Sequence, residues 1–413
     1  MVKRASLVLG FLAVTFTLAV SAWSPASTRL DPVGVVAHEW GTFTSVAGPD
    51  GTAVDWLPVG GPVDLPCFVD RYKNLRLVKV NLGLSRPLTY NEAPRVLRGK
   101  VRTETPVVYF YSPADATVDV RVTFPRGLMT EWYPRATVRQ PEFTPGSLSR
   151  INITSTIEWR DVKVSPRSIE NYPVEPGPSH YYAARATDAS PVLVNGQQEK
   201  FLFYRGVASF DVPVSALTTS DGGVRVKSLG SHGLRSVILF ENRGGRLGFR
   251  VHGALHGEAT VAAPASLADP AAIRAELERA LTDAGLYPRE ARAMVETWRD
   301  SWFEEGTRIF YVLAPQDVDR LLPLDIQPAP RHVARVFVGR TEVITPDVMT
   351  AVGAAIASRD GATLERHGRF LGAIADRLMT AGTTDAERAQ ISDVTNAAFG
   401  AYLDRFAACP AQQ

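Results

Sequence analysis

Residues 117–124 read TVDVRVTF, and this stretch decides the fold class. Val118, Val120 and Val122 alternate with polar residues, so all three fall on one face of an extended chain, as in a half-buried strand. Many short strands without βαβ alternation predict an antiparallel, β-sandwich-like region. Polar turn clusters separate the other segments that are rich in β-branched and aromatic residues: 101–111, 153–164, 201–210, 237–240 and 247–252.

The hydrophobic period changes beyond about residue 262. Asp269-Pro270 opens a helix with apolar residues four apart. A second helix, 288–305, places Trp298 and Trp302 on one face, where they are expected to pack against the β-rich region. Strands are predicted at 308–313 and 333–338, and Ala-rich helices over 347–358, 362–380 and 384–407.

These patterns together predict an α+β protein in four parts. An antiparallel β-sandwich-like region comes first, a mixed connector follows, and a helical region ends the chain. The parts are a signal peptide (1–22), a β-rich domain (33–262), a mixed α/β segment packed on it (263–345) and a helical tail (346–413).

Residues 1–22 have the features of a secretory signal peptide. Lys3 and Arg4 precede an uncharged, mostly apolar stretch, and Val20-Ser21-Ala22 offers small residues for cleavage. The apolar stretch is also near the minimum length of a membrane span, so a retained anchor is the alternative. The sequence predicts a periplasmic or extracellular protein, with membrane attachment only if this segment is not cleaved.

The composition is that of an ordinary globular protein, with 413 residues of which 45% are hydrophobic. Without residues 1–22 the chain has 43 basic and 43 acidic residues, since that segment holds two basic residues and no acidic one. This balance argues against a nucleic-acid partner, which would need clustered Lys and Arg. Cys67 and Cys409 are the two cysteines; in an exported protein they could pair or stay as separate thiols.

The segment 38–44, HEWGTFT, is the most distinctive in the sequence. On a strand, His38, Trp40 and Thr42 share one face, and Glu39 and Phe43 lie on the other. His38 can move protons, and Trp40 can stack on a sugar or another ring. The alternative is a first strand whose polar groups fix the edge of a domain.

Three Glu-Trp pairs, at 39–40, 131–132 and 158–159, match the carboxylates and aromatic platforms of glycoside hydrolysis. Polar and aromatic neighbours also single out several arginines, which can clamp a carboxylate or phosphate, or form structural ion pairs. The candidate catalytic residues are His38, Glu104, Glu131 and His180. The candidate substrate-binding residues are Trp40, Arg102, Trp132, Tyr181, Arg185 and Arg205.

Standard catalytic and cofactor motifs are absent from the sequence, which identifies no cofactor and no metal. His252 and His256 resemble a metal-binding pair. Four residues of a strand span about 13 Å, however, which is too far for two ligands of one zinc ion.

Seven segments, taken together, resemble a family of uncharacterised exported bacterial proteins. The resemblance implies export and one integrated unit from about residue 38 to 340, and it carries no activity. It does not extend into the tail beyond about 345. The segments are HEWGTFTSV (38–46), ETPVVYFYS (104–112), TEWYP (130–134), HYYAAR (180–185), FLFYRG (201–206), TWRDSWFEEGTRIFY (297–311) and RVFVGR (335–340).

Two functions are open on this basis, and a third, a metal-dependent protein, rests only on scattered histidines. The first is a hydrolase for a polar or glycan-like substrate, with Glu as general acid or base, His as proton shuttle, aromatic rings as platforms and Arg as anion clamp. It expects His38, Glu104, Glu131, Trp132 and His180 to meet in one cleft. The second is a non-catalytic β-sandwich protein that binds or organises a cell-envelope component, with the same residues as core and edge structure.

Overall fold

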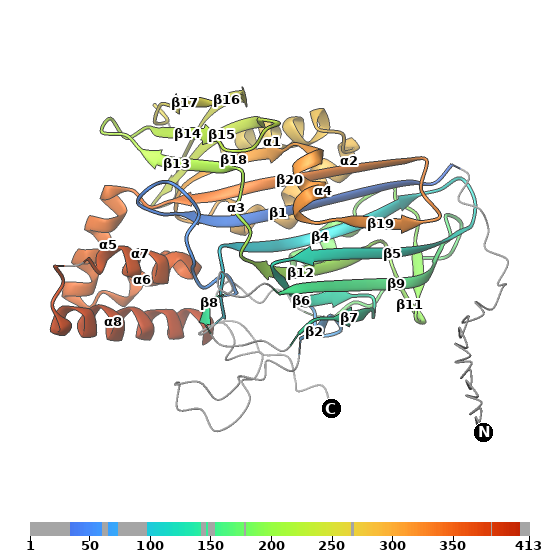
Figure 1. Cartoon of the computed structure of the whole chain (residues 1–413), viewed down its shortest axis with the longest axis horizontal. Coiled ribbons are helices and arrows are strands. Elements are labelled where there is room, and N and C mark those ends of the chain that lie inside the picture. Colours follow the sequence, from blue (N-terminus) through green and yellow to red (C-terminus); the bar gives the residue numbers. More distant parts are fainter. Residues whose placement is uncertain are drawn as a thin grey trace, which may run out of the picture.

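The structure is a computed structural model of the chain, and it describes residues 34–59, 65–72, 97–141, 146–147, 153–176, 179–265, 268–380 and 382–404. The expected signal peptide, residues 1–22, lies outside the described residues. The described part is a mixed α and β structure in which strands predominate and helices lie mainly toward the C-terminus (Figure 1). None of the described helices is both long and apolar enough to cross a membrane.

A nine-stranded sheet runs through the whole molecule. All neighbouring strands in it are antiparallel except β1 and β20, which are parallel. Its order is β16 (Arg246–Leu255), β15 (Leu234–Arg243), β18 (Gly306–Leu313), β20 (His332–Val343), β1 (Val36–Ala47), β4 (Val101–Tyr111), β12 (Leu202–Ala208), β6 (Gly127–Tyr133) and β2 (Asp70–Arg71).

Strand β1 lies at the centre of this sheet, between β20 and β4. Every residue of β1 except Val36 is buried, since both faces of the sheet are covered. The expected alternation within HEWGTFT is confirmed: Trp40 packs in the core on one face, and Phe43 in the core on the other. A mixed sheet therefore places the most distinctive motif of the sequence at its middle.

A six-stranded sheet covers one face of the nine-stranded sheet. A single hydrophobic core contains residues from both sheets, including Phe43 of β1 and the three valines of the TVDVRVTF stretch, each at most 1% exposed. The predicted strand at 117–124 is thereby confirmed. The six-stranded order is β11 (Gln197–Glu199), β10 (Val192–Val194), β9 (Thr154–Val164), β5 (Ala116–Pro125) and β19 (Leu324–Gln327), with β7 (Thr137–Arg139) paired to β9.

Two smaller sheets complete the strands of the described residues. The first joins β13 (Val214–Thr218), β14 (Val224–Ser228) and β17 (Glu258–Val261), and the second joins β3 (Leu97–Arg98) to β8 (Gly146–Ser147).

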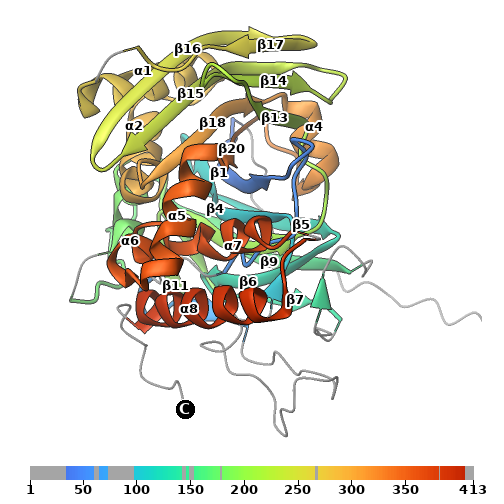
Figure 2. The same cartoon turned by 90° about the vertical axis from the view of Figure 1, so that its left-hand side faces the viewer.

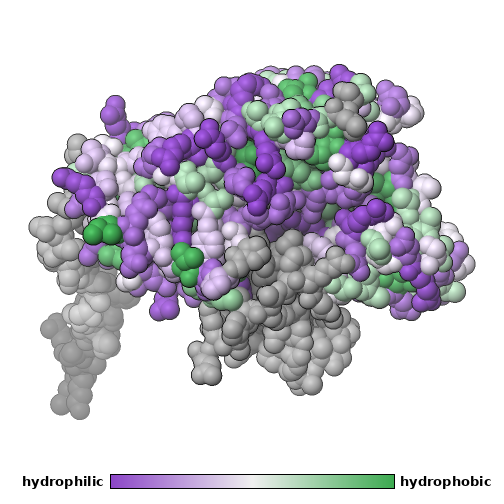
Figure 3. Space-filling model, turned by 180° about the vertical axis from the view of Figure 1, so that it is seen from behind, coloured by the Kyte–Doolittle hydropathy of each residue, from purple (hydrophilic) through white to green (hydrophobic). Residues whose placement is uncertain are grey.

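Helices cover the opposite face of the nine-stranded sheet. A second core there contains Trp298 and Trp302, as their shared helix face predicts, together with Trp40 of β1. Figure 3 shows this side from behind, where hydrophilic side chains predominate and hydrophobic ones form small groups. The covering elements are η3 (His180–Arg185), α1 (Pro270–Asp283), α2 (Pro288–Thr297) and α3 (Arg299–Trp302).

The C-terminal helices form a third core at one end of the strands (Figure 2). Trp56 stacks on Phe370 at 5.4 Å and thereby joins these helices to the β part. The helical region predicted beyond residue 346 is confirmed over the described residues. Its elements are α5 (Pro346–Ser358), α6 (Gly361–Arg366), η4 (Gly368–Phe370), α7 (Leu371–Leu378) and α8 (Asp385–Asp404).

The expected segment 263–345 does not form a layer of its own. Its strands β18 and β20 lie inside the nine-stranded sheet, between β15 and β1, and α4 (Pro315–Leu321) connects toward β19 of the other sheet. The chain therefore returns to the middle of the first sheet almost 300 residues after β1. The boundary drawn near residue 262 marks a change of sequence pattern and not a change of hydrophobic core.

Cys67 is disulfide-bonded. Cys409, the other cysteine of the sequence, lies outside the described residues.

Candidate functional site

Two clusters of polar side chains lie on the helix-covered face of the nine-stranded sheet; in the first only His38 and Glu290 are buried, Tyr111 is half-buried, and Tyr287 and His332 are exposed. The first, here called the His38 cluster, consists of His38, Tyr111, Tyr287, Glu290 and His332. The second, here called the charged band, consists of Arg102, Glu104, Glu131, Arg205, Glu304, Arg308, Arg340, Glu342 and Arg369. Along β1, His38 is four residues from Thr42, which is opposite Glu104, and six from Thr44, which is opposite Arg340, so the band begins about 13 Å from His38 and reaches about 20 Å.

The centre of the first cluster is a buried His–Glu pair. His38 Nδ1 lies 2.6 Å from Glu290 Oε2, and the two side chains are 2% and 0% exposed. An ionised Glu290 can only accept, so Nδ1 then carries the proton and Nε2 has its lone pair free. Nε2 makes no hydrogen bond to any described residue.

The start of α2 explains why Glu290 lies there. Pro288 occupies the first turn, and the Glu290 carboxylate accepts the backbone N–H of Tyr287 at 2.9 Å, as in a capping box. One carboxylate thus caps the helix and orients His38. The sequence prediction missed Glu290, although the YPRE pattern at 287–290 signals such a cap.

Aromatic rings surround His38. The ring centroids of Tyr287, Tyr111 and His332 lie 4.5, 5.2 and 6.4 Å from that of His38. Burial and the negative charge of Glu290 raise the pKa of Tyr111, so its hydroxyl stays protonated and can donate a hydrogen bond.

A hollow of about 810 Å³ opens beside this cluster. Tyr111 lines the hollow. Arg289, which precedes Glu290 in the chain, and Arg331, which precedes His332, line it as well. Its volume is within the range of small-molecule sites. The other polar side chains that line it are Ser112, Glu170, Arg185, Thr187, Asp188, Ser190 and Lys200.

Most of the cations in the hollow are ion-paired. Arg185 Nη2 lies 2.6 Å from buried Glu199, which also accepts from the Tyr181 hydroxyl at 3.1 Å. Lys200 pairs with Glu170, and Arg289 with Asp188. Arg331 forms no ion pair with a described residue, so it is the cation most available to an anionic group in the hollow.

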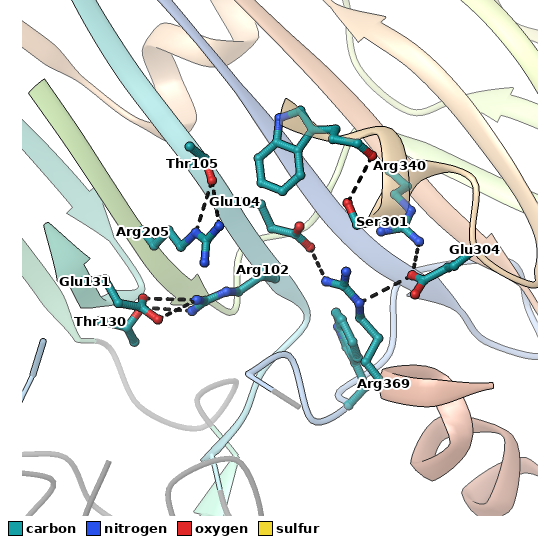
Figure 4. A network of polar contacts seen from close by, with 12 residues as sticks. Arg102, Glu104, Thr105, Thr130, Glu131, Arg205, Ser301, Glu304, Arg340 and Arg369 are labelled. Carbon is teal, nitrogen blue, oxygen red and sulfur yellow. Dashed lines mark hydrogen bonds and ion pairs between the residues drawn. The ribbon is translucent and has the colours of Figure 1, made fainter. Parts of the chain in front are cut away.

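The charged band extends across the nine-stranded sheet from β18 to β6, and five of the six strands in this range contribute members to it (Figure 4). Arg102 Nη2 donates to both carboxylate oxygens of Glu131 at 3.0 Å, and Nη1 donates to Thr130 Oγ1 at 2.8 Å. On the next strand, Arg205 donates to Thr105 Oγ1 at 2.9 and 3.1 Å. Alternation along β4, β6 and β12 brings these side chains to the same face.

The C-terminal helices supply one member of the band. Arg369 of η4 donates to Glu104 Oε1 at 2.7 Å and lies 3.4 Å from Glu304, which also pairs with Arg340 (Figure 4). Arg308 donates to Glu342 at 2.9 Å. The band is therefore assembled from segments that are far apart in the sequence.

In the charged band, burial and ion pairing have opposite effects on the pKa values of the carboxyl groups. Burial alone would raise the pKa of Glu104, but the charges of Arg369 and Arg340 outweigh it and lower the pKa. The pKa of Glu304 is also lowered, because the charges of Arg369 and Arg340 outweigh the effect of its burial. Burial raises the pKa of Glu342, and it lowers the pKa of Arg340 to about 10.

The structure divides the sequence-derived candidates among several places. Glu104, Glu131, Arg102 and Arg205 belong to the charged band. Glu104 lies opposite Thr42, four residues along the strands from His38, so about 13 Å separates them. The expected meeting of the candidate acids and His38 in one cleft is not seen.

The other candidates lie outside both clusters. Arg185 lines the hollow and Tyr181 is buried beside it, while His180 pairs with Asp300 of α3. Trp40 is in the core beneath the helices, and Trp132 packs against the core between the large sheets, so neither serves as an exposed platform.

No group of three His, Cys, Asp or Glu side chains converges to hold a metal ion anywhere in the described ranges. His252 and His256 are exposed, at the end of β16 and in the turn after it.

No protein-family model matches the chain, and no curated protein matches its sequence. The candidate function is therefore argued from the geometry of the two clusters.

Proposed function

We propose that the protein is an exported hydrolase for a polar substrate, with His38 as the acid–base group and Glu290 as the residue that positions it. The observation that carries the proposal is the 2.6 Å His38–Glu290 pair beside the hollow. A carboxylate on one ring nitrogen fixes the tautomer and leaves the other nitrogen to take a proton from water or a hydroxyl group.

The hollow supports a substrate with hydroxyl or negatively charged groups. Ser112, Thr187 and Ser190 offer hydroxyl groups, and Arg331 offers a positive charge that no described acidic side chain pairs with. Tyr111 connects the hollow to His38, since it lines the hollow and its ring contacts the imidazole. A glycan or another polar molecule with an anionic substituent fits this set of partners.

Glu104 and Glu131, which the sequence suggested as catalytic residues, have no catalytic role in this proposal. Each is held by an arginine, and the lowered pKa of Glu104 keeps it ionised at neutral pH, so it is a poor proton donor. This observation favours the second candidate, a non-catalytic binding or cell-envelope scaffold protein of β-sandwich type. In that case the charged band and His38 are core and edge structure, and neither takes part in a reaction.

Two further parts of the proposal concern fold and location. We infer a β-sandwich-like arrangement of the two large sheets, because one hydrophobic core lies between them. We also infer export through residues 1–22, because these carry the charge and apolar pattern of a signal peptide. Cell fractionation tests the second inference, since recovery of the protein only from the cytoplasm would contradict export, and sequencing of its N-terminus tells a cleaved signal peptide from a retained anchor.

The test of activity is a panel of chromogenic glycosides, carboxylic esters and phosphate esters, assayed with the mature protein. The proposal expects turnover of at least one class and a loss of about 100-fold or more in His38→Gln. His252→Gln is the matched control, because His252 is exposed and lies on the edge strand β16, four strands away from β1, which carries His38. No turnover by the wild-type protein, or equal rates in a folded His38→Gln variant, would favour the binding protein.

A further inference from the structure

Arg340 is a fully buried arginine whose hydrogen bonds are incomplete. Its side chain is 0% exposed, and its Nη2 pairs with Glu304. Nε and Nη1 donate to no acceptor among the described residues. Buried donors without an acceptor are rare, because each carries an uncompensated loss of hydration.

A second unpaired donor lies nearby on the same face of the sheet. Thr42 is 0% exposed, and its hydroxyl has no partner in the described part of the chain. In the sheet register, Thr42 is opposite Glu104, and Thr44 is opposite both Arg340 and Arg102. Arg340 and Arg102 are thus two strands apart, with Cα atoms separated by about 10 Å.

Among the described residues of the charged band, positive charges outnumber negative ones by one. The charged band holds five guanidinium groups and four carboxylates, and all nine side chains are at least largely buried. Figure 4 shows that Arg340 and Arg369 approach Glu304 from two sides. An added anion would balance the excess positive charge, whereas an added cation would increase it.

We propose that the charged band is a binding site for an oxyanion, a carboxylate or phosphate group, which accepts hydrogen bonds from Arg340 Nε and Nη1 and from Thr42. An oxyanion has several acceptor oxygens, so one ligand can satisfy donors that point from different residues. The site is separate from the hollow beside His38, and it does not depend on the proposed hydrolase activity.

Arg335 shows that a buried arginine of this sheet can be fully satisfied without a ligand. It lies on β20 like Arg340, five residues earlier and on the opposite face. Its Nε donates to Glu39 at 2.7 Å, Nη1 to Asp319 at 2.8 Å and Nη2 to the Leu322 carbonyl at 2.6 Å. The contrast with Arg340 points to a missing partner at Arg340 and not to a general property of buried arginines here.

The experiment measures binding of radiolabelled inorganic phosphate and of acetate to the full-length mature protein by equilibrium dialysis, at constant ionic strength set with chloride. The proposal expects saturable binding of one ion per chain, and a rise in Tm with the same concentration dependence. If only phosphate binds, the natural ligand carries a phosphate group. If only acetate binds, the natural ligand carries a carboxylate. Binding of neither ion overturns the proposal.

Variants then locate the ion. Arg340→Lys keeps the charge but loses the Nε and Nη1 donors, so the affinity should fall by roughly 10- to 100-fold. Arg335→Lys, the matched control, should leave the affinity within about twofold, even if it lowers Tm. Equal losses in both variants would show that the ion binds elsewhere and would overturn the assignment.

Thr42→Val keeps the test decisive if Arg340→Lys does not fold. The substitution removes one unpaired hydroxyl at nearly constant shape, so the ligand-free protein should be as stable as the wild type or more stable. If Thr42 donates to the ion, the affinity should fall by about two- to tenfold. An unchanged affinity in this variant would contradict the proposed site.

Discussion

Arg369 of η4 donates from Nη1 to Glu104 Oε1 on β4 at 2.7 Å, although 265 residues separate the two. Both side chains are 5% exposed. This bond joins the C-terminal helices to the nine-stranded sheet through buried charges, beside the apolar contact of Trp56 with Phe370. The helices are therefore part of the architecture of the charged band.

Glu104→Gln should lower the free energy of unfolding by about 3–5 kcal/mol, because the arginines around it would keep their buried charge without this counterion. Asp376→Asn is the control. It breaks the link between Arg98 and Asp376, whose side chains are 36% and 45% exposed, and should lower the stability by at most about 1 kcal/mol. Urea unfolding measures both, and similar losses would contradict a special role for the Glu104 pair.

His367 should make the protein sensitive to mild acid. Burial lowers its pKa from 6.5 to about 4, so the folded state prefers the neutral ring. The stability that this provides is complete above pH 6.5 and is lost as the pH falls toward 4, by up to about 3 kcal/mol. His367→Gln should flatten the stability profile between pH 6.5 and 4, as measured by urea unfolding at each pH. An unchanged slope in the variant would exclude His367 as its source.

Gly306→Ala should disrupt the Arg308–Glu342 pair. Gly306 has φ +128°, and a Cβ atom there would lie 2.1 Å from Glu342 Oε1. Gly285→Ala separates backbone strain from collision, because Gly285 has a similar φ of +121° but nothing within 4 Å of a Cβ atom. Strain alone should cost about 1–3 kcal/mol at Gly285, and the added collision should cost at least about 1–3 kcal/mol more at Gly306. Equal changes in Tm would contradict the collision.

Local patterns predicted most of the elements. The alternation in TVDVRVTF places β5 correctly, and the 101–111 segment coincides with β4. Apolar spacing of three and four predicts α1, α2 and the C-terminal helices. Each of these patterns is set by residues within one element, so the sequence carries it directly.

Which strands pair with each other in the sheet could not be predicted from such local patterns. Periodicity identifies β1 and β20 as strands, but their parallel pairing depends on contacts almost 300 residues apart. The same limit applies to the candidate site. His38, Glu104 and Arg102 were singled out by their motifs, whereas Glu290 and Arg369 come from helices whose docking positions only the tertiary structure provides.

A double-mutant cycle on kcat/KM measures whether Glu290 acts on catalysis through His38. With the substrate identified from the panel, Glu290→Gln should lower kcat/KM by about 100-fold or more, and the His38→Gln/Glu290→Gln double variant should be no slower than His38→Gln alone. Circular dichroism would establish that each variant is folded. A folded Glu290→Gln variant with wild-type kcat/KM, or losses that simply add, would contradict the account.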